Sequence, residues 1–172
     1  MTKLSKKVKP KTLQTPLSKE IKESKKPKVF QVSFPSEFEM MKKPISRAYD
    51  FICKNEPRLN EDDKGDVKLV INELVANAIS HGNRQNKSKK VYLRVKLEDD
   101  SVIANIADEG KGFDYRTYFS DKSSKVDWQQ MRESGRGIKL AASLMDSIAF
   151  NSLGNEVKFL KKVKPCGHNS NC

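Results

Sequence analysis

Hydrophobic and polar positions along the chain predict a succession of strands and helices that begins near residue 29. Short stretches in which apolar residues alternate with polar ones or run together predict strands: 29–34, 91–97, 102–108, 148–152 and 157–163. Apolar residues at helical spacing predict three helices: 36–54, 62–81 and 137–146. Helices packed on a sheet whose strands run mainly antiparallel predict an α+β fold, a two-layer α/β sandwich.

The ends of the first two helices carry local sequence signals. Ser36 followed by Glu39 has the pattern of a capping box, which predicts that Ser36 caps the first helix. Pro44 lacks a backbone N–H and therefore predicts a kink in this helix or a later start. Gly82-Asn83 predicts the end of the second helix. The first helix is expected to bury a face made of Phe38, Met41, Ile45, Ala48, Tyr49 and Ile52.

Residues 73–83, with the sequence ELVANAISHGN, are the most informative stretch of the chain. Glu73 and Asn77 are four residues apart and share one helix face, and His81 lies one turn further along. The apolar stripe beside them consists of Val67, Val70, Ile71, Leu74, Val75, Ala78 and Ile79. A carboxylate, an amide and an imidazole in one row indicate either a site on the polar edge of a buried helix or an ordinary solvated face.

Two glycine pairs follow. In DEGKGF, residues 108–113, Asp108 ends a predicted strand, and Gly110 and Gly112 allow a tight turn and a close approach of a ligand to the backbone. Gly135 and Gly137 open the last helix, where free N–H groups and the positive end of the helix dipole suit a phosphate. Each pair alone is also what an ordinary turn uses.

In this order and spacing, the helix with Glu-x-x-x-Asn, the Asp-x-Gly-x-Gly and the Gly-x-Gly resemble the nucleotide-binding motifs of the GHKL (Bergerat-fold) ATPase superfamily. That superfamily includes gyrase-type ATPases, Hsp90 and the catalytic domains of histidine kinases. The resemblance covers residues 29–163. The short chain and the wording of residues 73–83 look most like the anti-sigma factor serine/threonine kinases of bacterial partner-switching systems. The resemblance implies that ATP and Mg²⁺ are the cofactors.

The resemblance also implies roles for single residues. Asn77 would coordinate the Mg²⁺ ion that bridges the phosphates, because a hard cation prefers oxygen ligands. Glu73 would act as general base for the acceptor hydroxyl. Asp108 would accept a hydrogen bond from the exocyclic amine of adenine, while Gly110 and Gly112 would let the chain pass close to the nucleotide.

Other positions of the resemblance are less determined. Gly135 and Gly137 would wrap the phosphates, and Arg136 between them is either a phosphate ligand or a surface arginine. Many relatives have Gly-Thr near the last strand, where the threonine supports the adenine-binding aspartate. Gly154-Asn155 stands at the matching place here, and Asn155 retains the capacity to hydrogen-bond.

Residues 113–134 correspond to the ATP lid of the family. Cations that would close over the phosphates are Lys111, Lys122, Lys125 and Arg132, and the sequence does not choose among them. Trp128 is expected to anchor the lid or to contact a partner. His81 is expected to be structural, because the pattern of a phospho-accepting histidine does not follow it. The sequence also shows no separate dimerisation hairpin carrying such a histidine, which argues against a complete histidine kinase.

Most of the net charge of +12 lies in residues 1–28, which hold ten lysines and two glutamates and so carry +8. This stretch is also rich in serine and proline, which predicts a disordered basic tail. Such a tail contacts nucleic acid, RNA polymerase or acidic lipid, or only keeps the chain in solution. Because the middle of the chain is nearly neutral, nucleic acid is not expected to be the primary partner.

The folded ATP-binding domain is expected to span residues 29–164, followed by a flexible tail at 165–172. The tail contains three possible metal ligands, Cys166, His168 and Cys172, but no second Cys-x-x-Cys pair, so metal binding there is not favoured. No run of about eighteen apolar residues predicts a membrane span. Three cysteines, an odd number, fit a reducing, cytoplasmic location.

The resemblance therefore implies an ATP-dependent serine/threonine protein kinase that is also an anti-sigma factor. It would bind a sigma factor, phosphorylate an anti-anti-sigma partner with a STAS domain, and form a homodimer. Two other interpretations stay open. One is a nucleotide-dependent switch that binds partners without phosphorylating them, which Glu73 disfavours. The other is a nucleic-acid-binding protein that acts through its basic tails.

Overall fold

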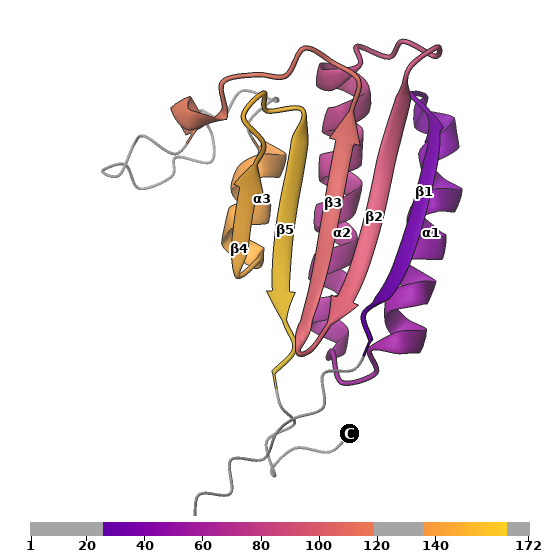
Figure 1. Cartoon of the computed structure of the whole chain (residues 1–172), viewed down its shortest axis with the longest axis vertical. Helices are drawn as coiled ribbons and strands as arrows, with labels where there is room; N and C mark the ends of the chain where they lie inside the picture. Colours follow the sequence, from indigo (N-terminus) through magenta and orange to yellow (C-terminus); the bar gives the residue numbers. More distant parts are fainter. Residues whose placement is uncertain (1–25, 119–135, 165–172) are drawn as a thin grey trace, which may run out of the picture.

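The computed structural model describes residues 26–118 and 136–164. One antiparallel sheet of five strands forms the front layer, and the helices form a second layer on one face of the sheet (Figure 1). The elements are, in chain order, β1 (Lys28–Pro35), α1 (Phe38–Asn55), α2 (Glu61–Asn77), the π-helical turn η1 (Ala78–Gly82), β2 (Lys90–Glu98), β3 (Ser101–Asp108), the 3₁₀ turn η2 (Tyr115–Tyr118), α3 (Arg136–Leu144), β4 (Ser147–Phe150) and β5 (Glu156–Lys162). The predicted α+β two-layer sandwich is confirmed.

The order of the strands places β3 in the middle of the sheet. The strands lie in the order β1-β2-β3-β5-β4, and every neighbouring pair is antiparallel. β5 follows β4 in the chain but inserts between β3 and β4, after the chain has passed through α3 on the helical layer (Figure 1). The carboxyl end of β3 therefore lies near the last turn of α2 and the first turn of α3.

The core lies between the two layers. Every second residue of the central strands is buried, including Val91, Leu93 and Val95 on β2 and Ala104 and Ile106 on β3. The helices contribute residues at helical spacing, among which Val67, Val70, Ile71, Leu74 and Val75 form the buried stripe of α2. Each fully buried side chain of this size contributes about 1.5–3 kcal/mol. The two hydrophobic periods read from the sequence therefore meet in one core.

The start of α1 differs from the prediction. Ser36 is completely buried, and its N–H donates to the carbonyl of Lys89 at 2.9 Å, which continues the edge of the sheet by one residue. Glu37 is the N-cap and makes no capping bond through its side chain. The predicted capping box of Ser36 and Glu39 is therefore wrong, because the sheet holds Ser36 outside the helix. Phe38, predicted to be buried, is 40% exposed in the first turn.

Pro44 lies inside α1 without a later start of the helix. The helix is continuous from Phe38 to Asn55, and Pro44 is buried against the core. A proline in a helix interior leaves the carbonyl four residues earlier without its usual partner. That residue is Met40, which is 47% exposed in the first turn of the helix.

α2 has a side-chain cap that places its first turn. Asn60 accepts a hydrogen bond from the N–H of Asp63 at 2.7 Å, which satisfies one of the free donors of the first turn. Three acidic residues follow in that turn, where the helix dipole favours negative charge.

Among residues 26–118 and 136–164, no helix combines the length and the apolar character needed to cross a membrane.

Candidate functional site: a nucleotide pocket at the end of α2

The last turn of α2 widens into a π turn. The N–H of Asn83 donates to the carbonyl of Ala78, five residues earlier, at 2.8 Å. Single π turns inside helices are frequent at functional sites, because they rotate the residues that follow out of α-helical register. Here the turn brings His81 and Gly82 to the wall of a pocket beside the end of β3. His81, expected to be structural, is exposed in that wall.

The pocket has a volume of about 230 Å³. It lies between the end of α2, the carboxyl end of β3, the first residues of β5 and the chain after β3. Its lining residues are Leu74, Asn77, Ala78, His81, Gly82, Ile106, Asp108, Gly112, Phe113, Ile138, Phe150, Gly154, Asn155, Glu156 and Val157. Four residues predicted to bind nucleotide, namely Asn77, Asp108, Gly112 and Asn155, therefore line one pocket. An apolar pocket with a few convergent polar groups is what a small ligand requires.

Asp108 contributes a carboxylate to the wall of this pocket. Burial raises the pKa of its carboxyl group, and the hydrogen bond from the N–H of Gly110, at 2.7 Å, opposes that increase. The main chain of Asp108 is fixed by Asn155, whose carbonyl accepts from the Asp108 N–H at 3.0 Å and whose side-chain amide donates to the Asp108 carbonyl at 3.1 Å. Asn155 thus supports Asp108 through the main chain rather than through the carboxylate.

Glycines let the backbone close around Asp108. A Cβ on Gly82 would collide with the carboxylate of Asp108, and a Cβ on Gly110 would collide with the carbonyl of Gly82. Gly112 and Gly154 have φ angles of 75° and 76°, a region that favours glycine. Their α-carbons face the carbonyls of Leu153 and Phe113 respectively, so a side chain at either position would meet backbone. Gly82, predicted only as a helix end, is needed for space beside Asp108.

Two asparagines that were not predicted to belong to the site hold these turns. Asn83 is buried and accepts from the N–H of Glu109 at 2.9 Å while donating to the carbonyl of Lys90 at 2.8 Å. Asn151 accepts from the N–H of Gly154 at 2.8 Å and donates to the side chain of Asn155 at 2.7 Å. Asparagine after a strand is a common signal for such turns, and that signal was available at Asn151.

Glu109, beside Asp108 in the sequence, points away from the pocket. Its carboxylate accepts from the hydroxyl of Tyr92 at 2.7 Å and from the N–H of Lys90 at 2.9 Å. These two bonds lower the pKa of Glu109 and hold its charge on the outer side of the sheet. Neighbouring carboxylates therefore have separate surroundings: Asp108 faces the pocket and Glu109 ties the turn to β2.

Glu73 and Asn77 meet α3 at one edge of the pocket. Gly137, in the first turn of α3, is buried against both. A Cβ at this position would lie 2.8 Å from Nδ2 of Asn77 and 3.3 Å from Oε2 of Glu73. Glu73, the predicted general base, and Asn77, the predicted metal ligand, therefore both lie next to Gly137 of the last motif. Glu73 does not line the pocket of Asp108 itself but lies beyond Asn77, on the side of α3.

The side chain of Asn77 offers an amide oxygen, the type of neutral ligand that Mg²⁺ accepts. Its Nδ2 atom, which donates hydrogen bonds and cannot bind a cation, is buried without a partner among the described residues and is therefore free to donate to an acceptor such as a phosphate oxygen. Mg²⁺ is usually held by one or two protein oxygens together with phosphate oxygens and water, rather than by a protein cage. Residues 26–118 and 136–164 contain no group of three or more His, Cys, Asp or Glu side chains that could hold a metal ion.

Several predicted residues cannot be placed at the site. Gly135 and the lid cations Lys122, Lys125 and Arg132 lie outside the described residues, as do Trp128 and the tail ligands Cys166, His168 and Cys172. The structure gives the backbone of Arg136 as the first residue of α3. Lys111 is described and exposed.

Comparisons with known proteins show the family to which the chain belongs. Residues 34–161 match the family of the histidine kinase-like ATPase domain. The chain is 31% identical over 121 residues to the anti-sigma F factor of Bacillus subtilis (strain 168), an alignment that covers 66% of this chain and 77% of the relative. It is also 31% identical over 110 residues to the serine-protein kinase RsbW of Staphylococcus aureus (strain MSSA476), covering 60% and 68%. The chain thus belongs to the histidine kinase-like ATPase family, and its relatives there are anti-sigma and serine-kinase proteins.

Proposed function

We propose that the protein is an ATP-dependent serine/threonine kinase of the anti-sigma type. The observation that carries the proposal is the edge where Glu73, Asn77 and Gly137 meet, next to a pocket lined by the half-buried carboxylate of Asp108. A nucleotide that sets its base on Asp108 would extend its phosphates toward Asn77 and the first turn of α3. The positive end of the helix dipole favours phosphate there.

Each residue at this edge has a task that its chemistry can perform. Bound Mg²⁺-ATP would supply the transferable phosphoryl group, with its charge offset by the metal. Asn77 would offer its amide oxygen as a metal ligand. Glu73, one helical turn earlier, would orient the acceptor hydroxyl and take its proton. Their positions four residues apart on α2 set the spacing of Glu73 and Asn77, and Gly137 packs so closely on both that it leaves no space for a side chain of its own.

The relatives suggest which macromolecules the protein meets. One is named an anti-sigma factor and another a serine-protein kinase. We infer that this chain binds a sigma factor and phosphorylates an anti-anti-sigma protein with a STAS domain on serine or threonine. We also expect it to form a homodimer, which light scattering on the purified chain would measure.

Phosphoryl transfer tests the proposal directly. The full chain would be incubated with Mg²⁺-ATP and a protein extract of the host, with Glu73→Gln in parallel and Glu98→Gln as the control. Glu98 pairs with Lys96 at the opposite end of β2 from the pocket. Mass spectrometry should find one small protein newly phosphorylated by the wild type and by Glu98→Gln. Loss of the general base should slow that reaction by about 10²- to 10⁴-fold.

The contrary result is equally informative. If the wild type binds Mg²⁺-ATP but no phosphorylation depends on Glu73, the kinase proposal fails. The nucleotide-dependent switch without catalysis would then be the better description.

A further inference from the structure

A lysine lies on the buried face of β5. Every second residue from Val157 to Val163 is buried and faces the helices. One of them is Lys161, which is only 8% exposed. A buried amine is costly unless it is paired and hydrogen-bonded. Burial alone would lower the pKa of Lys161, but Asp63 above all, with Asp66 and Asp146, raises it above its usual value, so the amine stays charged.

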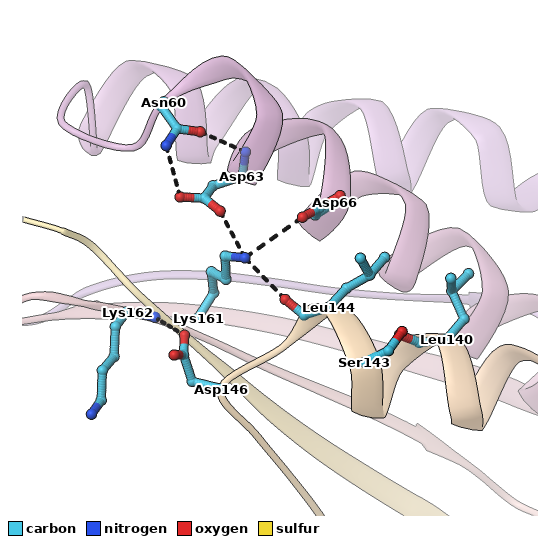
Figure 2. A network of polar contacts seen from close by, with 9 residues as sticks. All are labelled: Asn60, Asp63, Asp66, Leu140, Ser143, Leu144, Asp146, Lys161 and Lys162. Atoms are coloured by element: carbon cyan, nitrogen blue, oxygen red, sulfur yellow. Dashed lines mark hydrogen bonds and ion pairs between the residues drawn. The ribbon is translucent and has the colours of Figure 1, made fainter. Parts of the chain in front are cut away.

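The amine of Lys161 connects three elements (Figure 2). Its Nζ lies 2.7 Å from Oδ1 of Asp63 and 3.6 Å from Oδ2 of Asp66, both in the first turns of α2. It also donates a hydrogen bond of 2.9 Å to the carbonyl of Leu144, the last residue of α3. One side chain of β5 thus holds the start of α2 and the end of α3 together.

The contacts of Lys161 with Asp63, Asp66 and Leu144 form what we call the Lys161 joint. Its charges match the dipoles of both helices. The carboxylate of Asp63 lies at the positive end of α2 and is fixed from the other side by the amide of Asn60 at 3.0 Å. The last turn of α3 contains no basic residue of its own. Lys161 therefore supplies from β5 the cation that the negative end of α3 favours, and it satisfies one of the carbonyls that the helix leaves free.

The opposite end of α3 is part of the candidate site. α3 has nine residues and is therefore about 13 Å long. Its first turn carries Gly137, which packs on Glu73 and Asn77 near the end of α2. The two helices thus run antiparallel and contact each other at both ends: through Lys161 at one end and through Gly137 at the other.

We propose that Lys161 is a positioning residue for the phosphate end of the site, because it sets where α3 lies along α2 and hence how Gly137 meets Glu73 and Asn77. This inference deepens the proposed function and rests on it for the role of those two residues. Lys161 does not line the nucleotide pocket. The end of the pocket proposed to hold the adenine is built on β3 and on the turn around Asn155. Its effect should therefore fall on the phosphates and not on the base.

Binding of two ligands separates these ends. Mg²⁺-ATP uses both ends of the site, whereas adenosine, which has no phosphate, uses only the end at Asp108. The full chain with Lys161→Met should lose about tenfold in affinity for Mg²⁺-ATP, the size of effect seen when a supporting residue is removed. Its affinity for adenosine should stay within about twofold of the wild type. Calorimetric titration measures both, below the unfolding transition of each variant.

The chain offers a matched control on the same strand. Lys162 has the same charge, and its side chain points away from the network in Figure 2, where only its N–H bonds to Asp146, at 2.7 Å. Lys162→Met should change neither affinity. Lys161→Arg, which keeps the positive charge, should retain most of the affinity for Mg²⁺-ATP.

Unchanged binding of Mg²⁺-ATP by folded Lys161→Met would overturn the proposal, and so would an equal loss for both ligands. If Lys161→Met does not fold, Asp66→Asn decides by the same criterion. That carboxylate is partly exposed and only 3.6 Å from the amine, so its loss loosens the joint without leaving a buried lysine unpaired. A failure of the kinase proposal would appear separately, as no phosphorylation by the wild type, and would not affect this comparison of affinities.

Discussion

The two ends of α2 differ in how their polar side chains are paired. At the first turn these side chains have hydrogen-bond or ion-pair partners in the protein, whereas at the last turn the amide nitrogen of Asn77 has none among the described residues. Asn60, Asp63 and Lys161 form hydrogen bonds and an ion pair with one another and with α3 (Figure 2). At the other end, Asn77 has a buried nitrogen without a partner among the described residues. The helix also departs there from α-helical geometry, in the turn Ala78–Gly82.

The difference separates two uses of buried polar groups. A buried group with all its partners in the protein fixes the position of an element, and removing one partner exposes the cost of burying the other. A buried group without a partner in the protein costs stability, and a ligand that binds beside it can supply the missing partner. The first end should therefore respond to substitution with a loss of stability and the last end with a loss of binding.

The largest loss of stability is expected from Asp63→Ala. The change removes the carboxylate at 2.7 Å from Lys161 and leaves a buried amine with weaker partners. Breaking a buried ion pair from one side should lower the free energy of unfolding by about 3–5 kcal/mol. Urea unfolding of the ligand-free protein measures it.

Glu61→Gln is the control for that prediction. Glu61 pairs with Lys64 in the same turn, but its side chain is 82% exposed. An exposed pair contributes at most about 1 kcal/mol. If both variants lost the same small amount, the network at the first turn would not be a structural joint.

Asn77→Ala should show the opposite pattern. No hydrogen bond of Nδ2 is lost in the free protein, so the free energy of unfolding should change by less than about 1 kcal/mol. The affinity for Mg²⁺-ATP should fall by about 10- to 100-fold. Asn72→Ala is the control on the same helix: its amide donates only to the carbonyl of Lys68. A destabilised Asn77→Ala that still binds Mg²⁺-ATP normally would contradict the assignment.

The smallest expected effect is a dependence on pH at Asp108. Burial raises the pKa of this group in the folded protein above its ordinary value of 3.8, so the folded state holds the proton more tightly than the unfolded chain. Its contribution to stability is therefore greatest below pH 3.8 and is lost as the pH rises through the raised pKa. Asp108→Asn should gain in stability relative to the wild type over that window, in urea unfolding series at several pH values. A difference that is constant with pH would show that the carboxyl is not perturbed.

Much of the fold could be predicted from the spacing of apolar residues along the sequence, because the residues at that spacing form the core. The strand ending at Asp108 and the helix carrying Glu73 and Asn77 are found where predicted. Ser36 was misassigned because capping is a local signal, and the pairing of its N–H with Lys89 across the sheet decided the helix start instead.

The joint at Lys161 was not predicted, although its position alternates with Val157 and Phe159 and so marks it as facing inward. Its partners come from α2 and α3, far away in the sequence, and no local pattern indicates them. The same holds for Gly82, whose need for space beside Asp108 exists only in three dimensions. Motifs name the residues that contact a ligand, while the residues that hold them in place depend on tertiary structure.

The π turn has a consequence for protein engineering. An α-helical turn uses 3.6 residues, so the wider turn at Ala78–Gly82 accommodates about one additional residue. Deleting that residue, or grafting this helix into a scaffold as a regular cylinder, would rotate His81 and Gly82 by roughly 100° about the helix axis. Gly82 would then leave the carboxylate of Asp108, and the pocket would lose one wall. A transplanted or redesigned version of this site must keep the irregular turn together with the motif.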